Sequence, residues 1–179
     1  MIAAQTWWHL ARTGGLVAWA LVSASVIWGL LLSTRVLGRR PTRPWLLEMH
    51  RYFSALAVAA VVVHVGALLA DSYIQFRLVD VAVPMASSWR PGAVAWGVVT
   101  MYLLLIVEIT SIAGDRLPHR MWWWIHMTSF VLFALGTIHG LKAGTDATNA
   151  LVRIAMIVGI AEVTFILGVR VVYRRRAWH

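Results

Sequence analysis

Five long apolar runs, separated by short polar stretches, constrain the fold of this chain more than any other feature. They cover residues 14–32, 45–70, 93–112, 121–141 and 151–172. Each run has the roughly 20 residues that a helix needs to cross the hydrocarbon core of a bilayer. A helix also satisfies its own backbone hydrogen bonds there. The sequence therefore predicts an all-α membrane protein, a bundle of about five transmembrane helices forming a single domain over residues 1–179.

The composition excludes a soluble domain. Hydrophobic residues make up 60% of the 179 residues and charged residues 13%, whereas soluble domains have about 45–50% and about 25%. A globule of this size has too little interior to bury that much apolar surface. The lipid bilayer is therefore the expected surrounding of the chain.

The basic residues predict the orientation of the bundle. A net charge of +9 is compatible with nucleic-acid binding, but the arginines gather at the ends of the apolar runs, so we expect no nucleic-acid partner. When the loops are assigned alternately to two sides, one side receives Arg35, Arg39, Arg40, Arg43, Arg51, Arg116, Arg120, Arg170, Arg174, Arg175 and Arg176. The other side receives Arg12, Arg77, Arg90, Lys142 and Arg153. The positive-inside rule makes the first side cytoplasmic, which places the N-terminus outside and the C-terminus inside, in a multi-pass protein of the cell membrane.

The chain contains no cysteine. This excludes disulfides, thiolate zinc sites, iron–sulfur clusters, CxxCH haem attachment and thiol catalysis. Any metal site must therefore be built from other side chains.

Four histidines form two pairs on two predicted helices: His50 and His64 on the second, His126 and His139 on the fourth. Intramembrane ionisable side chains are costly and usually functional. The first pair is 14 residues apart, about 21 Å along a helix, and the second 13 residues, about 20 Å. Both helices run in the same direction, so His50 and His126 share the inner level of the membrane and His64 and His139 the outer level.

Two imidazoles from facing helices at each level suit a six-coordinate, b-type haem iron. Two such haems, stacked across the membrane, would give an electron path from face to face. Zinc or di-iron is less favoured because each level lacks the further histidines or carboxylates of those sites. For any single histidine, a neutral, packed core residue remains an alternative, as does a non-redox protein that handles metal ions or protons.

The 13-residue spacing would place His126 and His139 about 140° apart on an ideal helix, so the fourth helix is expected to bend, to carry a bulge, or to present its two ligands at different approach angles. Gly136 and Gly140 flank His139 and would permit a local distortion.

At these histidines the chain resembles the ferric reductase-like transmembrane domain shared by NADPH oxidases and ferric reductases. That family has haem-ligating histidines 14 apart on one helix and 13 apart on another. The local sequences also agree: residues 50–53 read HRYF, 122–126 read WWWIH and 138–140 read IHG. The stretch LARTG at residues 10–14 resembles the entry to an early family helix, where an arginine lies near the outer haem.

The resemblance implies transmembrane electron transfer, with His50 and His126 binding the inner haem and His64 and His139 the outer one. It implies the haem-bearing subunit of a ferric reductase- or oxidase-like system. The chain ends at Arg174–His179 without the GxGxxG motif of a nucleotide-binding unit, so we expect a separate donor, a flavoprotein or a quinol, and an outer-face acceptor. The chain is also similar to a membrane haem subunit that feeds a periplasmic reductase, which is the alternative function.

Several other polar and aromatic residues are also candidates for roles near the predicted haem levels or the membrane surface. Arg12 and Arg51 lie near the predicted haem levels and are candidates for binding haem propionates, since arginine pairs well with carboxylates. Glu108 and Glu162 fall within apolar runs, and Glu162 lies near mid-membrane, where a carboxylate needs a partner or a proton. The tryptophan run at 122–124 predicts interfacial anchoring.

Overall fold

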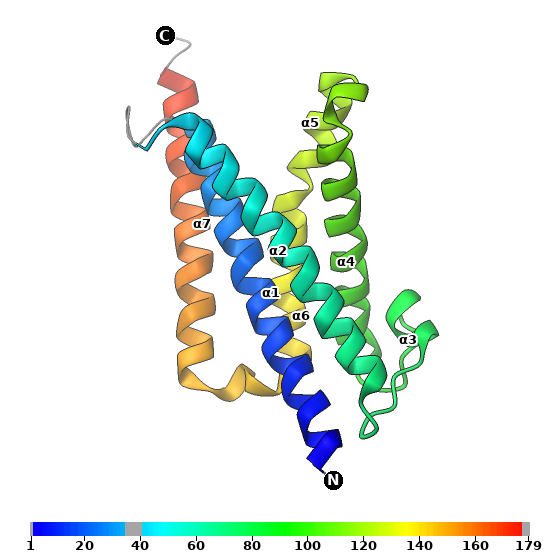
Figure 1. Cartoon of the computed structure of the whole chain (residues 1–179). Helices are drawn as coiled ribbons and strands as arrows, with labels where there is room; N and C mark the ends of the chain where they lie inside the picture. Colours follow the sequence, from blue (N-terminus) through cyan, green and yellow to red (C-terminus); the bar gives the residue numbers. More distant parts are fainter. Residues whose placement is uncertain (1, 35–40, 177–179) are drawn as a thin grey trace.

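The computed structural model describes residues 2–34 and 41–176, and every regular element in these ranges is helical (Figure 1). The elements are α1 (Ile2–Thr34), α2 (Arg43–Ala70), α3 (Leu78–Ala82), α4 (Pro91–Ile112), η1 (Gly114–Arg116), α5 (His119–Met127), α6 (Ser129–Ala143), η2 (Thr145–Thr148) and α7 (Ala150–Arg176).

Five helices among the described residues are long and apolar enough to cross a membrane, with α5 and α6 counted as one span. This confirms the predicted all-α, five-helix membrane fold, and each predicted apolar run lies inside one of these helices. Three arginines of the orientation argument, Arg35, Arg39 and Arg40, lie outside the described residues, as do the side chains of residues 174–176.

Two of the spanning helices have a proline in their first turn. Pro44 lies in the first turn of α2 and Pro91 is the first residue of α4. Proline suits this position because the first helical N–H groups have no partner within the helix. Arg90, directly before α4, has a left-handed backbone with a φ of 43°, which turns the chain out of the preceding loop.

The helices form two packed groups around a shared interior. In Figure 1, α1 and α2 run antiparallel and side by side, α4 packs on α6, and α1 also contacts α6 and α7. We call the end of the bundle that holds α3 and η2 the α3 end, and the opposite end, which holds α5, the α5 end. At the α3 end α1 and α4 begin and α2 and α6 finish, so these four helices can contribute residues to one level.

The fourth span is broken at Thr128, between α5 and α6. The backbone N–H of Thr128 donates to the carbonyl of Ile125, three residues back, at 3.0 Å, and its hydroxyl donates to the same oxygen at 2.6 Å. A turn with this pattern rotates the chain by about 20° more per residue than an α-helix. This extra rotation brings His126 and His139 closer to one face of the span than they would be at the separation of about 140° around the axis of an ideal helix.

The break does not lie at Gly136 or Gly140, the glycines that would permit a distortion, because both lie within the continuous helix α6. They allow close packing instead. A Cβ atom on Gly136 would lie 3.3 Å from Thr100 of α4, and one on Gly140 would lie 3.0 Å from Met156 of α7. At these two positions, the absence of a side chain allows α4 and α7 to lie close to α6.

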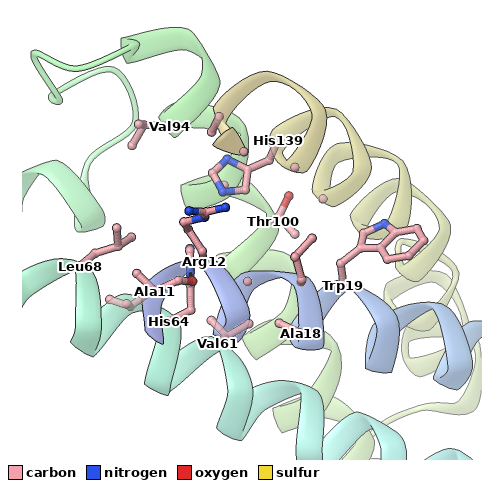
Figure 2. A pocket seen from close by; sticks show the side chains of 18 of the residues that line it. Ala11, Arg12, Ala18, Trp19, Val61, His64, Leu68, Val94, Thr100 and His139 are labelled. Atoms are coloured by element: carbon pink, nitrogen blue, oxygen red, sulfur yellow. Dashed lines mark hydrogen bonds between the residues drawn. The ribbon is translucent and has the colours of Figure 1, made fainter. Parts of the chain in front are cut away.

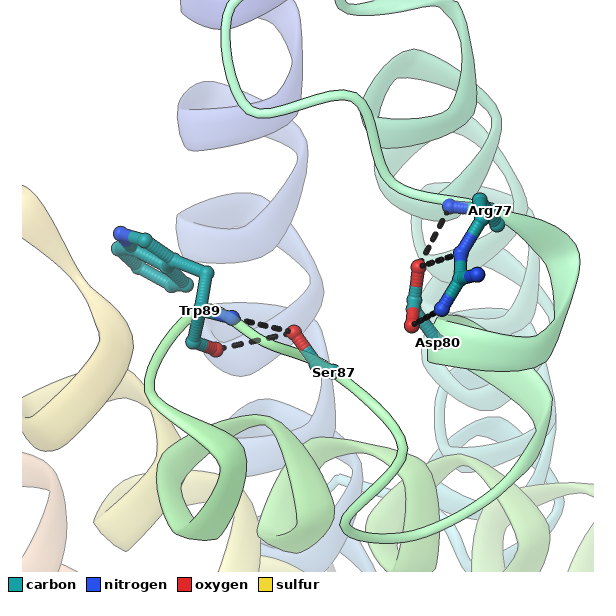
Figure 3. Close-up of polar contacts among 4 residues, drawn as sticks. All are labelled: Arg77, Asp80, Ser87 and Trp89. Atoms are coloured by element: carbon teal, nitrogen blue, oxygen red, sulfur yellow. Dashed lines mark hydrogen bonds and ion pairs between the residues drawn. The ribbon is translucent and has the colours of Figure 1, made fainter.

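A short polar network shapes the loop that contains α3 (Figure 3). The Arg77 side chain donates to the Asp80 carboxylate at 3.2 Å, and the Arg77 backbone N–H donates to it at 2.8 Å. These hydrogen bonds, the side-chain one foremost, hold the pKa of Asp80 below its usual range. Further along the loop, the Ser87 hydroxyl donates to the carbonyl of Trp89 at 3.0 Å.

Candidate functional site

The four intramembrane histidines lie in two facing pairs. The ring centroids of His50 and His126 are 5.8 Å apart, with 68° between the ring planes. Those of His64 and His139 are 6.3 Å apart, at 77°. In each pair one ring comes from α2 and the other from the fourth span. The first pair lies toward the α5 end and the second toward the α3 end.

These separations fit two imidazoles that hold one metal ion between them. An imidazole nitrogen lies about 2.0–2.1 Å from its metal, so the centroids of two rings on opposite sides would be about 6.4 Å apart. The pair at the α3 end comes very close to this separation, and the pair at the α5 end is slightly shorter.

Three of the histidines are fixed by the same hydrogen bond to a neighbouring helix. Nδ1 of His50 donates to the carbonyl of Ser25 at 2.8 Å, and Nδ1 of His64 donates to that of Ala11 at 2.6 Å. Nδ1 of His139 donates to the carbonyl of Ala93 at 2.8 Å. A neutral imidazole that donates through Nδ1 keeps its lone pair on Nε2, which is the arrangement of a metal-binding histidine.

A glycine accompanies each of these carbonyls, four residues later on the same helix. The three pairs are Ala11 with Gly15, Ser25 with Gly29, and Ala93 with Gly97. A Cβ atom would lie 3.1 Å from the His64 ring at Gly15, 3.2 Å from the His50 ring at Gly29, and 2.6 Å from the His139 ring at Gly97. Without a side chain at these positions, the imidazole can reach a carbonyl that already accepts a helical hydrogen bond.

His126 is held differently. Its Nδ1 atom lies 3.3 Å from the hydroxyl oxygen of Ser111 on α4. The Trp122 ring stacks on it at 4.9 Å between centroids and 19° between planes, and His119 stacks on Trp122 at 5.7 Å. Trp122, expected as an interfacial anchor, is therefore also a contact of the histidine pair, whereas Trp124 is 60% exposed.

The apolar runs and histidine spacings do not predict these supporting residues, although the sequence holds a signal for them. Gly15 and Gly29 are 14 residues apart, the same spacing as His50 and His64. Gly97 and Ser111 on α4 are also 14 apart. Small residues 14 apart, equal to one histidine spacing and one residue longer than the other, mark the helix faces on which the rings pack.

A cavity surrounds the histidine pair at the α3 end (Figure 2). Its wall is mainly apolar and comes from α1, α2, α4 and α6, with smaller parts of α3, η2 and α7. In Figure 2, His139 points from α6 toward Arg12 and His64. The wall thus combines two imidazoles, one arginine, the Asp146 carboxylate and a large apolar surface, a lining suited to a planar, mostly apolar cofactor.

Arg12 forms a two-pronged ion pair with Asp146 of η2. Its Nε donates to Oδ2 of Asp146 at 2.8 Å, and its terminal NH2 group donates to Oδ1. Both side chains are partly buried and line the cavity. The ion pair ties the first turns of α1 to the loop before α7.

Three other residues singled out in the sequence lie away from this cavity. Arg51 follows His50 and its side chain is exposed. Glu108 on α4 is partly buried and accepts a hydrogen bond from Ser54 at 3.2 Å. Glu162 is exposed near the middle of α7.

Within residues 2–34 and 41–176, no group of three or more His, Cys, Asp or Glu side chains could together hold a metal ion. Each histidine pair thus offers two protein ligands, fewer than the three or four of zinc sites. Haem supplies its own equatorial nitrogens and needs only axial ligands from the protein. The donor set therefore fits haem better than a bare zinc ion.

Comparison with known proteins identifies one family. The family described as ferric reductase like transmembrane component matches residues 14–137, which include α2, α4 and most of α1 and α6. Among curated proteins no match was found, and no solved structure matches the chain. The matched range contains three of the four paired histidines, and His139 follows it by two residues.

Proposed function

This chain belongs to the family of ferric reductase-like transmembrane components, and from that premise we propose that it passes single electrons across a membrane through two b-type haems. His50 and His126 would hold one haem, and His64 and His139 the other. The observation that carries the proposal is the pair of facing imidazoles at each level, whose Nδ1 atoms are already hydrogen bonded. Bound haem supplies a one-electron iron couple whose potential depends on its axial ligands and surroundings.

The protein's own residues orient and insulate these sites. The carbonyls of Ala11, Ser25 and Ala93 accept hydrogen bonds from the Nδ1 atoms of three imidazoles, which orients each ring and leaves its Nε2 available as a ligand. Such hydrogen bonds also raise the basicity of the ligand nitrogen. Apolar side chains of the surrounding helices keep water away from the interior. The local dielectric constant is therefore low, and each hydrogen bond to an imidazole is electrostatically stronger than it would be in water.

Arg12 is our candidate for binding a propionate at the α3 end, because it lies on the cavity wall between two helices. Its present partner, Asp146, is a carboxylate, which is the chemical group that a propionate would supply. Arg51 is the corresponding candidate near His50, where its exposed side chain could pair with a propionate at the membrane surface.

We assign the α3 end to the outer face and the α5 end to the cytoplasm, on the distribution of the arginines. Electrons would enter at the His50–His126 haem from a separate flavoprotein or quinol. They would leave from the His64–His139 haem to a ferric chelate, to oxygen or to a partner reductase at the outer face of the cell membrane. In the last case the chain would act as the membrane haem anchor of that reductase.

A haem assay on the purified protein tests the proposal. We expect two haems per chain with the optical spectrum of six-coordinate iron. His64→Ala and His139→Ala should each remove the same haem, and His50→Ala and His126→Ala the other. His9→Ala is the matched control, because His9 is an exposed histidine of α1. A protein that binds no haem, or that keeps both haems in all four variants, would refute the proposal, and stoichiometric zinc would support a non-redox role.

A further inference from the structure

Helix α7 stands at the edge of the bundle and uses only part of its circumference to hold the fold together (Figure 1). It packs mainly against α1 and η2. Met156 and Val163 are 2% and 5% exposed on the packed face, and Gly159 lets Trp19 of α1 approach. Ile166 and Leu167 also pack against the core, and most of the remaining side chains between Leu151 and Val172 are exposed.

One line of exposed residues on α7 follows a strict alternation of three and four positions. We call it the Glu162 seam, and it consists of Leu151, Ala155, Val158, Glu162, Phe165, Val169 and Val172. All are exposed except Val169, which is partly buried, and Leu151 and Phe165 are 77% and 72% exposed. Steps of three and four keep side chains on one stripe that faces a second helix, as in a left-handed pair of parallel helices.

Glu162 lies close to the centre of this stripe and of the span Ala150–Val172. Among the described residues, none forms a hydrogen bond or ion pair with the Glu162 side chain. Acidic side chains at this depth almost always face a partner or a water-filled cavity. The only acidic residue of the seam therefore requires a polar group from outside this chain, at the same depth.

We propose that the Glu162 seam is the contact surface for a second copy of this chain, packed in parallel about a two-fold axis along the membrane normal. All copies cross the membrane in the same direction, so this axis brings each seam residue to the level of its own counterpart. The two Glu162 carboxyls then meet near mid-membrane. One of them, protonated, donates its O–H to the carboxylate of the other, so both are satisfied by a group that the sequence already supplies.

A polar residue at the centre of a helix seam also sets the register of the pair. A helix of a different protein would need its own polar side chain at the matching depth, whereas a second copy provides one by symmetry. The proposal does not depend on haem binding, because the seam lies on the side of α7 that is turned away from α1.

Disulfide cross-linking in membranes tests the seam directly, because the chain has no cysteine of its own. We expect Val158→Cys and Phe165→Cys to form a dimer on mild oxidation. Ile157→Cys and Ile160→Cys are the matched controls, since both positions are exposed on α7 at 61% and 39% but lie off the seam. Equal cross-linking at all four positions, no cross-linking at any of them, or capture of a different protein would overturn the proposal.

The role of Glu162 is tested in the Val158→Cys background. Glu162→Gln keeps a hydrogen-bonding group, so the dimer yield should stay within about twofold, whereas Glu162→Leu should lower it about fivefold or more. Unchanged helical content and thermal melting of both variants in detergent would establish that the fold is intact. A yield that is the same for glutamine and leucine would overturn the role of the carboxyl pair.

Discussion

Gly97 lies so close to His139 that a Cβ atom on Gly97 would come within 2.6 Å of Cε1 of the imidazole. A separation this short cannot be accommodated without moving the ring or the helix. We therefore expect Gly97→Ala to displace His139 and to remove most of the haem that it holds with His64. Haem content should fall from about two to about one per chain, since two axial ligands are needed for a six-coordinate iron.

The control for this variant is Gly66→Ala, because Gly66 is a helical glycine with nothing within 4 Å of the added Cβ atom. It should retain both haems. Gly15→Ala should have an intermediate effect, since its Cβ atom would lie 3.1 Å from the His64 ring and a small shift would relieve the contact. Full haem content in Gly97→Ala would contradict the packing argument.

The sequence was sufficient to predict the spans and the levels at which histidines meet, because both follow from periodic patterns along single helices. The supports of the imidazoles were not predicted, since Ala11, Ser25 and Ala93 contribute backbone carbonyls. A carbonyl carries no signature in its own side chain. The glycine four residues after each carbonyl is the one sequence feature associated with it. This glycine can be interpreted only when the structure shows which helix packs against it.

Ser111 offers a second test, at the other histidine pair. Its hydroxyl is the polar partner of Nδ1 of His126, at 3.3 Å. We expect Ser111→Ala to keep the haem but to weaken electron donation by the imidazole. The oxidised iron is then less stabilised, so the potential of this haem should rise by about 20–60 mV, the equivalent of one hydrogen bond of about 0.5–1.5 kcal/mol.

A redox titration followed optically measures this shift. Thr110→Ala is the matched control, because the adjacent Thr110 hydroxyl donates to the carbonyl of Ile106 instead. The potential of the haem at His64 and His139 should be unchanged in both variants. A shift of the same size in the control would mean that any hydroxyl on this turn of α4 has the effect.

Arg12 and Asp146 could not be predicted as partners. They are 134 positions apart, and Asp146 lies in the short helix η2, where no periodic pattern indicates which way a side chain points. The break at Thr128 was missed for a related reason. The spacing of His126 and His139 indicates a distortion in the fourth span, and glycine is the residue type usually associated with one. The tightened turn is instead made by the hydroxyl and the backbone N–H of Thr128, which both donate to the carbonyl of Ile125.

The propionate role of Arg12 leads to a third prediction. Arg12→Gln should lower retention of the haem at the α3 end about fivefold, because it removes a charge-assisted hydrogen bond. Asp146→Asn should have little effect on retention, because it leaves the guanidinium available. Haem content after extended dialysis in detergent measures the difference. Equal losses in the two variants would instead assign Arg12 to holding the η2 loop in place.

The loop around α3 should respond to acid through Asp80. Hydrogen bonds from Arg77 lower the pKa of this carboxyl in the folded loop. Because the pKa of Asp80 is lower in the folded loop than in the unfolded loop, its carboxylate stabilises the folded loop fully at pH values above the unfolded-state pKa. This stabilisation is lost as the pH falls through the folded-state pKa. The loop should therefore be well ordered at pH 7 and should loosen below about pH 4, the usual range of an aspartate. Hydrogen exchange at the backbone amides of α3, corrected for intrinsic rates, measures this.

The variant Asp80→Asn separates this effect from general acid damage. It removes the charge at every pH, so its α3 amides should exchange faster than those of the parent protein at pH 7. The difference should shrink as the parent carboxyl becomes protonated. Asp115→Asn changes an exposed aspartate at the α5 end and should leave α3 unaffected. A ratio of exchange rates between parent and Asp80→Asn that stays constant from pH 7 to pH 3 would exclude the carboxylate as the group that orders this loop.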